Sequence, residues 1–231
     1  MTSTTAKFIL SEASEIPKWQ PAAWEDYLAA CEKLEFEEAR IFYYEGHLWI
    51  DMGNEGPQHA RFDDLFTIIF FVWFTTKLGQ AFDSLSGCVI EKPKVGAGAP
   101  DKVLYIGGNF PQWKKGEPRR INLNQWRVPD LVGEVADTTL ASDLDEKKRL
   151  YAALGIPEYW VVDINGERVL AFRLQENGKY QECQFSVALE GLPIALLSAT
   201  LKLLGEGNGI AAMWFAQQIE NLSADREQQE S

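Results

Sequence analysis

Two carboxylates stand in predicted strands whose other residues are mostly apolar, which is an unusual place for charge. Glu134 lies in the run LVGEVA and, because strand side chains alternate between two faces, it shares a face with Val132 and Ala136. Asp101 opens a second predicted strand over residues 101–106. A buried carboxylate requires a cation or a metal ion beside it, whereas an edge-strand glutamate or a turn aspartate faces water. Both interpretations of each acid are open at this point.

Helical periodicity directs one lysine toward the interior of the protein. The sequence predicts a helix from Asp143 to Leu154, and successive residues on a helix advance by about 100°. Lys147 then falls in the middle of the apolar side of the helix, whereas Lys148 points roughly 95° away from it. The Lys147 ammonium either meets an anionic partner inside the protein or reaches water while its stem covers the core.

Together, these three residues suggest one kind of site. Asp101 and Glu134 on neighbouring strands could bind Mg²⁺ through carboxylate oxygens, which are the hard ligands that this ion prefers. Lys147 beside them could stabilise a pentacovalent phosphate or help to deprotonate an attacking water. Two acids on strands and a lysine on the next helix resemble the phosphodiester-cleaving site of the PD-(D/E)XK nucleases.

Composition limits the other function classes. The chain has 231 residues and a formal net charge of -12, which argues against coating nucleic acid or an anionic membrane through bulk charge. Three cysteines without a CxxC pair, and only two histidines, exclude a zinc knuckle, a disulfide framework and a multi-histidine metal site. The N-terminus lacks the features of a signal peptide, and the apolar stretch 65–74 is too short for a bilayer, so we expect a cytoplasmic protein.

The order of predicted elements indicates a single mixed α/β domain over residues 21–220, between a flexible leader at 1–20 and a polar tail at 221–231. Hairpins are predicted around Glu45-Gly46 and Asn165-Gly166. The remaining predictions are helices at 21–35, 57–78, 142–154 and 207–220, strands at 81–95, 99–106, 129–136 and 179–187, and loops at 92–100 and 107–120. Ser142 or Asp143 is the expected N-cap of the third helix, and Gly155 its stop.

The run PDLVGEVADTT…SDLDEKKRLYAALGIPEYWVVD, from Pro129 to Asp163, closely resembles the Uma-two family of restriction-endonuclease-like proteins. An upstream hairpin, the segment EGPQH and a long helix fit the same family, and the resemblance covers roughly residues 35–190. It implies a PD-(D/E)XK core, with a central mixed sheet flanked by helices, an added N-terminal hairpin and C-terminal strands. It also implies an endonuclease that cleaves DNA with Mg²⁺ or Mn²⁺.

The resemblance also implies roles for single residues. Asp101 would be the first metal-binding acid and Glu134 the second. Ala136 occupies the usual position of the lysine, and the family lysine displaced onto the following helix maps onto Lys147. Asp130, in a second Pro-Asp pair, is an alternative first acid; we prefer Asp101 because the site needs acids from two strands.

Two further residues are accessory candidates. His59, near the start of the helix at 57–78, would contact phosphate or metal from the edge of the site, and Glu55 is an alternative acid on the same side. A polar pair in the loop before a helix is the competing interpretation. Asp163 is expected to be a turn acid before the Asn165-Gly166 hairpin.

Residues 91–120 combine basic and aromatic side chains. The segment holds seven basic and three acidic residues, a local charge of +4, interleaved with Tyr105, Phe110 and Trp113. Such a mixture suits nucleic-acid strands, although a solvated loop has the same composition. The candidate DNA-binding residues are Lys102, Lys114, Lys115 and, on the helix, Lys148.

Two other functions remain open beside the nuclease. One is an inactive nuclease scaffold that serves as a binding or interaction module. A metal-free carboxylate hydrolase is a weaker third possibility, because Lys147 would then have no evident role. Restriction-like enzymes often pair, so a homodimer is left open by analogy, and no membrane partner is expected.

Overall fold

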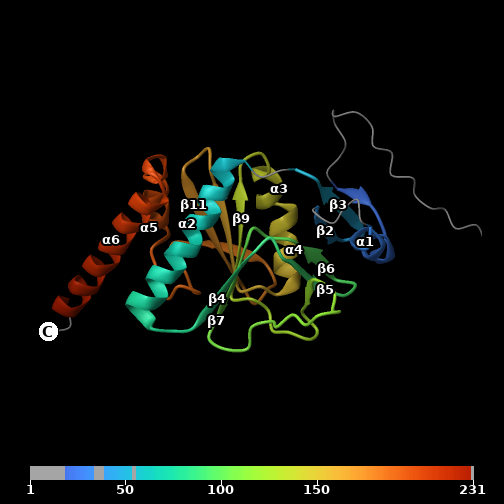
Figure 1. Ribbon diagram of the computed structural model, residues 1–231, viewed down its shortest axis with the longest axis horizontal. Helices are drawn as coiled ribbons and strands as arrows, with labels where there is room; N and C mark the ends of the chain where they lie inside the picture. Colours follow the sequence, from blue (N-terminus) through green and yellow to red (C-terminus); the bar gives the residue numbers. More distant parts are fainter. Residues whose placement is uncertain (1–18, 34–38, 54–55, 230–231) are drawn as a thin grey trace, which may run out of the picture.

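The computed structural model describes residues 19–33, 39–53 and 56–229 of the chain. It has the mixed α/β architecture expected from the sequence, and its elements are arranged in layers (Figure 1). The strands form two mixed sheets of six strands each, rather than the one central sheet that the family resemblance implied. The difference arises because the predicted N-terminal hairpin pairs with short strands farther along the chain.

The N-terminal sheet is built around this hairpin. Glu45 and Gly46 at the tip have φ angles of 47° and 72°, the left-handed backbone that a tight two-residue turn requires. Only β5 and β8 are parallel neighbours in this sheet. The strand order is β1-β3-β2-β6-β5-β8, with β1 at Gln20–Pro21, β2 at Arg40–Tyr44, β3 at His47–Asp51, β5 at Val89–Lys92, β6 at Gly96–Gly98 and β8 at Arg120–Asn122.

The central sheet carries the two acidic strands predicted from the sequence. Its order is β12-β11-β10-β9-β7-β4, with β4 at Phe82–Ser86, β7 at Lys102–Ile106, β9 at Leu131–Ala136, β10 at Glu158–Asp163, β11 at Arg168–Leu174 and β12 at Tyr180–Cys183. Strands β9 and β10 are parallel, and every residue of both is buried. Burial on both faces explains why their sequences are nearly continuous apolar runs.

Helices cover both faces of the central sheet. One face packs against α2 (Pro57–Trp73), α5 (Ile194–Leu201) and α6 (Asn208–Gln229), and the other packs against α4 (Glu146–Leu154) and the N-terminal sheet. Helix α1 (Trp24–Cys31) lies on the far side of the N-terminal sheet, as Figure 1 shows. A π-helical turn at Phe74–Leu78 follows α2, and a 3₁₀ turn at Leu204–Glu206 precedes α6.

Strand alternation sorts the side chains between two cores. Leu131 and Val135 of β9 enter the core beneath α2, α5 and α6. Val132 and Ala136 enter the core shared with α4 and the N-terminal sheet. Glu134 lies between these last two along the strand, so its side chain belongs to the second core, as the alternation predicted.

Strand β6 was predicted as part of the loop at 92–100. A Cβ on Gly96 would lie 2.6 Å from Leu150 Cδ1, so the absence of a side chain lets α4 pack directly on this strand. Pairing with β2 and β5 gives the backbone its hydrogen bonds although glycine has a weak strand preference. Strand β8 lies at the end of the predicted loop at 107–120, and α5 was missed entirely.

The predicted helix at 142–154 is two helices, α3 (Leu140–Leu144) and α4. The chain bends at Asp145, whose φ and ψ of -121° and -84° are not helical. Ser142 and Asp143 therefore lie inside α3, and the prediction of either as an N-cap was wrong. Gly155 follows the last residue of α4, as predicted.

The ends of the chain are only partly described. Residues 1–18 of the predicted leader lie outside the described residues, whereas Gln20 pairs with Leu48 as part of β1. Helix α6 continues through most of the predicted polar tail, to Gln229. Among the described helices, none has both the length and the apolar character that crossing a membrane would require.

Candidate active site

Asp101 is the residue immediately before β7 and shares a face with Val103. It is 3% exposed, and its Oδ1 accepts a hydrogen bond from Arg40 Nη1. Its Oδ2 accepts a 2.6 Å hydrogen bond from the Val135 amide and lies 3.3 Å from His59 Nε2. Burial alone would raise the pKa of Asp101, but His59 and the Arg40 charge outweigh burial and hold that pKa below its ordinary value.

Glu134 lies in the middle of β9 and is 1% exposed. Its Oε2 accepts a 2.8 Å hydrogen bond from Lys147 Nζ, and its Oε1 accepts one from the Tyr151 hydroxyl. Burial raises the pKa of Glu134 to about 8, and the nearby Asp101 charge adds to the effect, although Lys147 opposes it. Of the two interpretations of Glu134, the structure therefore shows the buried residue beside a cation rather than the edge-strand residue facing water.

Lys147 points inward from α4, as the helical periodicity predicted. Its Nζ lies 2.8 Å from Glu134 Oε2 and 2.8 Å from Asp143 Oδ1. It also lies 4.6 Å from the ring centre of Phe42 and 5.1 Å from that of Trp49. Burial lowers the pKa of Lys147, but the three surrounding carboxylates outweigh it and raise that pKa to about 12. Lys147 is therefore a permanent ammonium at neutral pH.

The structure brings the three predicted residues into one buried cluster. The backbone amide that binds Asp101 belongs to Val135, the residue after Glu134, so the two acids are neighbours across β7 and β9. Lys147 closes the cluster from the adjacent helix. The cluster lies in the interior between the central sheet, α4 and the β2–β3 hairpin.

Three further members of the cluster were missed. Tyr151 stands four residues after Lys147 on α4, a spacing that puts both on one helical face, whereas Asp143 reaches Lys147 from α3. The helical spacing of Tyr151 was visible in the sequence, but the bend at Asp145 that brings Asp143 to Lys147 was not. Arg40 gave no such signal, because it reaches Asp101 from a strand 61 residues earlier in the chain and also contacts Asp51 at 3.1 Å.

The acid pair has the donor chemistry of a hard divalent cation. Asp101 and Glu134 offer carboxylate oxygens, and Mg²⁺ usually binds proteins through one or two carboxylates together with waters and substrate phosphates. Within the described ranges, no group of three or more histidine, cysteine, aspartate or glutamate side chains is arranged to hold a metal ion.

Of the remaining acidic and histidine candidates, only His59 is seen to reach the cluster among the described residues. His59, at the start of α2, reaches the cluster through Asp101, whereas Glu55 lies outside the described residues. Asp130 binds the Ile106 amide at 2.7 Å and Arg127 at 2.8 Å, at the opposite end of β7 from Asp101. Asp163 binds the Gly166 amide at 2.8 Å and is the turn acid that was predicted.

The four lysines predicted to bind nucleic acid occupy different environments. Lys102 is 4% exposed, and its Nζ contacts Asp63, Thr67 and Ser86 at 2.7–2.9 Å. We had expected its ammonium at the surface, and the structure shows instead that it is buried. Lys148 lies 3.6 Å from the ring centre of Phe172 on β11. Lys114 and Lys115 are exposed in the loop before β8.

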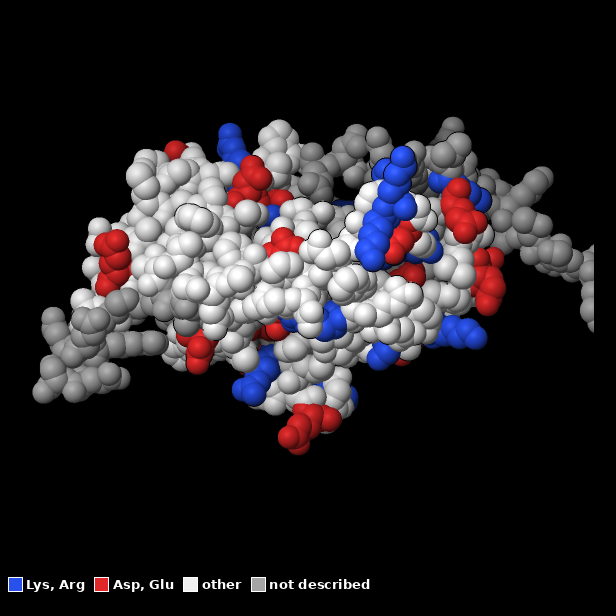
Figure 2. Space-filling view, turned by 60° about the horizontal axis from the view of Figure 1, so that its bottom comes forward, with Lys and Arg blue, Asp and Glu red and all other residues white. Residues whose placement is uncertain are grey.

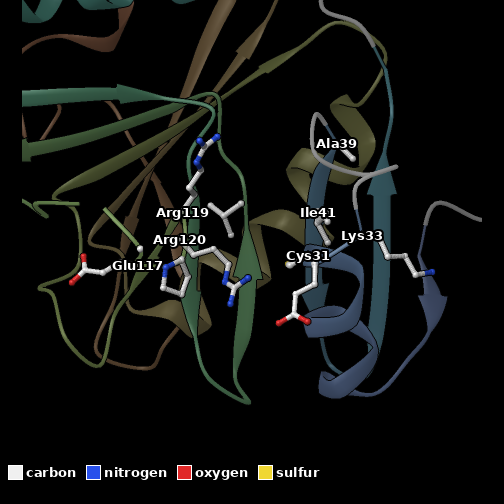
Figure 3. A pocket seen from close by; sticks show the side chains of 11 residues that line it. Cys31, Lys33, Ala39, Ile41, Glu117, Arg119 and Arg120 are labelled. Carbon is white, nitrogen blue, oxygen red and sulfur yellow. The ribbon is translucent and has the colours of Figure 1, made fainter. Parts of the chain in front are cut away.

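A hollow of about 520 Å³ lies between the end of α1, β2 and the segment 116–120 (Figure 3). Arg120 points across it toward Cys31, whereas Arg119 and Glu117 point away from it. The Arg120 Nε lies 3.0 Å from Glu91 Oε2, which also accepts a 2.8 Å hydrogen bond from the Tyr27 hydroxyl. None of the three candidate catalytic residues lines this hollow.

Comparisons with known proteins agree with this architecture. A family model described as "Uma2: Putative restriction endonuclease" matches residues 24–204. A solved structure of "a putative nuclease belonging to DUF820" from Anabaena variabilis ATCC 29413 has a TM-score of 0.55 and 18% sequence identity, covering 78% of this chain and 99% of that chain. At this identity the structural likeness shows the fold alone. No curated protein matches the sequence.

Proposed function

Because the chain belongs to the Uma2 family of restriction-endonuclease-like proteins, we propose that it is a metal-dependent nuclease that hydrolyses phosphodiester bonds in DNA. Asp101 and Glu134 would hold Mg²⁺ or Mn²⁺, and Lys147 would be the catalytic lysine. The family model covers all three residues. The observation that carries the proposal is their convergence, from β7, β9 and α4, in one buried and charge-paired cluster.

When bound, the metal ion would activate a water and offset negative charge on the phosphate. The protein's own groups then have distinct tasks. Lys147 remains an ammonium because its pKa is raised to about 12, so it would act on developing phosphate charge rather than as a base. Asp143 and Tyr151 would be positioning residues, since Asp143 contacts the ammonium and Tyr151 binds the second oxygen of Glu134.

Arg40 donates to one oxygen of Asp101, and the Val135 amide donates to the other. Its guanidinium bridges Asp101 and Asp51, from a strand of the β2–β3 hairpin. Metal binding at Asp101 would therefore require the Arg40 contact to give way, with Asp51 as the remaining partner. His59 beside the second oxygen would stay in reach of a phosphate that approaches the pair.

The test is a nicking assay on supercoiled plasmid with Mg²⁺ and with Mn²⁺. The wild type is expected to nick, and Asp101→Ala, Glu134→Ala and Lys147→Ala are expected to lose the activity. Asp130→Asn and Lys202→Ala, at an exposed lysine after α5, are controls outside the cluster, and both should nick like the wild type. Equal nicking by all six proteins, or none by the wild type across metals and substrates, would overturn the proposal.

A second function is favoured by one specific observation. Both acids already have protein cations as partners, Asp101 with Arg40 and Glu134 with Lys147, in an interior that is almost closed to solvent. This arrangement also suits an inactive scaffold that binds a partner. Calorimetry separates the two, because the scaffold should bind no Mn²⁺ and should have the same stability after Glu134→Gln.

A further inference from the structure

A cavity of about 630 Å³ lies between the loop 111–120 and the strands β5 and β8. We propose that it binds one unpaired nucleotide of a DNA strand, with the base stacked on tryptophan and the phosphate facing arginine. The inference deepens the proposed nuclease function, because it makes the substrate a DNA with a single-stranded segment. The volume falls within the roughly 300–1,000 Å³ range of small-ligand sites and is too small for a duplex.

The first wall of the cavity is a fixed aromatic surface. Trp113 is 57% exposed although it is one of the largest apolar side chains in the protein. Its indole Nε1 donates a 3.0 Å hydrogen bond to the Glu117 carbonyl, and Glu117 Oε2 accepts a 3.0 Å hydrogen bond from the Lys114 amide. The loop therefore closes on itself and holds the indole in place, while the ring remains exposed and available for stacking.

A second indole, that of Trp126, also lines the cavity. Trp126 is half-buried against the core that contains Ile121 and Val103. Its backbone amide donates a 3.0 Å hydrogen bond to the Asn122 carbonyl, which fixes the turn after β8. Base stacking on aromatic side chains is the usual means by which proteins hold single-stranded nucleic acid, since every base has an aromatic face.

The polar groups of the cavity match the other parts of a nucleotide. Arg120 is engaged by Glu91 at 3.0 Å, so the exposed Arg119 is the arginine placed to meet a phosphate. Gln112 and Gln125 also line the cavity, and their amides can both donate to and accept from a base edge. Stacking surface, amide edge groups and arginine are the three features that a nucleotide requires together.

The cavity lies on the same side of the central sheet as the candidate active site. Leu85 in its wall pairs with Val103 across β4 and β7, so the two side chains share a face. Asp101 is two residues before Val103 and therefore points to that face as well. The cavity and the acid pair thus belong to the same face of the sheet, and the acid pair itself is buried.

The charge distribution favours a local contact over a broad duplex footprint. On the face shown in Figure 2, basic side chains are separated by uncharged surface and by acidic side chains. The whole chain is strongly acidic, with a net charge of -12. Non-specific duplex binding depends on many phosphate contacts, whereas stacking in one cavity needs few.

The test measures binding without cleavage, in buffer with a chelator. Fluorescence anisotropy compares a labelled single-stranded oligothymidine with a duplex of the same length. The wild type is expected to bind the single strand more tightly than the duplex. Trp113→Ala should weaken single-strand binding by roughly tenfold, which is within the range of alanine substitutions at stacking residues. Arg119→Ala should weaken it several-fold.

Matched variants keep the result interpretable. Phe185→Ala removes an aromatic side chain that is 60% exposed elsewhere, and Arg61→Ala removes an exposed arginine on α2. Both should bind like the wild type, and Trp113→Phe should retain most of the affinity because it keeps an aromatic face. Circular dichroism melting confirms that each variant is folded.

Two outcomes overturn the cavity proposal: equal single-strand affinity for Trp113→Ala and the wild type, or a preference of the wild type for duplex. The proposed function fails independently, in the plasmid assay. If the protein never nicks plasmid but binds single strands through Trp113, the cavity proposal is supported and the nuclease proposal is contradicted. If the protein nicks plasmid but Trp113→Ala binds single strands as tightly as the wild type, the nuclease proposal is supported and the cavity proposal is contradicted.

Discussion

Lys147 Nζ lies 2.8 Å from Glu134 Oε2, and the two side chains are each only 1% exposed. The pair connects α4 to the middle of β9 in the interior of the protein. Asp143 on the same ammonium makes the lysine the partner of two carboxylates at once. Removing Lys147 therefore leaves two buried carboxyl groups without the cation that contacts both.

Lys147→Met should destabilise the protein strongly. The substitution leaves Glu134 and Asp143 buried without their cation, and breaking a buried pair typically costs about 3–5 kcal/mol. Urea unfolding measures the loss in the free energy of unfolding. Lys148→Met is the control, because Lys148 is the next residue of α4 and its ammonium lies over the Phe172 ring of β11 rather than beside a buried carboxyl group. The double variant Lys147→Met with Glu134→Gln should recover part of the stability. A loss below 1 kcal/mol would contradict the structure.

Arg40→Gln should strengthen metal binding. Arg40 competes for Asp101, and hydrogen bonds to charged groups contribute about 1.5–3 kcal/mol, so its removal should tighten Mn²⁺ binding by roughly tenfold. Isothermal titration calorimetry makes the comparison in the absence of DNA. Arg168→Gln, which removes the partner of Asp163 in a turn, serves as the control. Unchanged or weaker Mn²⁺ binding would show that Arg40 does not compete with the metal ion for Asp101.

The stability of the protein should fall as pH rises through the titration of Glu134. Its folded pKa is raised to about 8 from an ordinary 4.5, so the folded state holds this proton more tightly than the unfolded state. The resulting stabilisation is complete below pH 4.5 and disappears by pH 8, with a slope of at most about 1.4 kcal/mol per pH unit. Unfolding at pH 5–9, compared with Glu134→Gln, isolates the effect. Parallel pH curves for the two proteins would refute it.

Glu158→Ala should destabilise the fold without involving the candidate active site. The buried carboxylate accepts hydrogen bonds from Trp160 at 2.6 Å, Ser186 at 3.1 Å, and the Val187 and Ala188 amides at 2.8 and 2.7 Å. Alanine leaves these donors unsatisfied in the interior, at a cost of about 1–3 kcal/mol for each donor that finds no water. Glu158→Gln keeps an acceptor and should cost less. Chemical denaturation ranks the three proteins, and a reversed order would contradict this role.

Gly96→Ala should displace α4 and with it Lys147. The added Cβ would lie 2.6 Å from Leu150 Cδ1 and 3.2 Å from the Tyr43 carbonyl oxygen, which is backbone and cannot move aside. Overpacking of this kind typically costs about 1–3 kcal/mol. Gly56→Ala is the matched control, since nothing lies within 4 Å of a Cβ there. Thermal melting should show a loss for Gly96→Ala only.

Local patterns in the sequence were sufficient for part of this protein. Strand alternation placed Glu134 in a core with Val132 and Ala136, and helical periodicity aimed Lys147 inward, as the fold confirms. Both inferences depend only on the repeat of a strand or a helix, which a few neighbouring residues define. The same repeat contains Tyr151, whereas Asp143 lies in the separate helix α3 and meets Lys147 because the chain bends at Asp145.

Tertiary structure decided what these residues meet. Arg40 contacts Asp101 across 61 residues of chain, and Lys102, expected at the surface, is buried among side chains of α2 and β4. It also separated the two Pro-Asp pairs in space, because antiparallel pairing of β7 and β9 puts Asp101 beside Glu134 and Asp130 at the far end. No local repeat encodes such contacts, since strand pairing and register are set by the packing of the whole sheet. The sequence alone therefore determined that Glu134 and Lys147 face inward, and only the folded sheet determined the burial of Lys102 and the full set of partners around the acids.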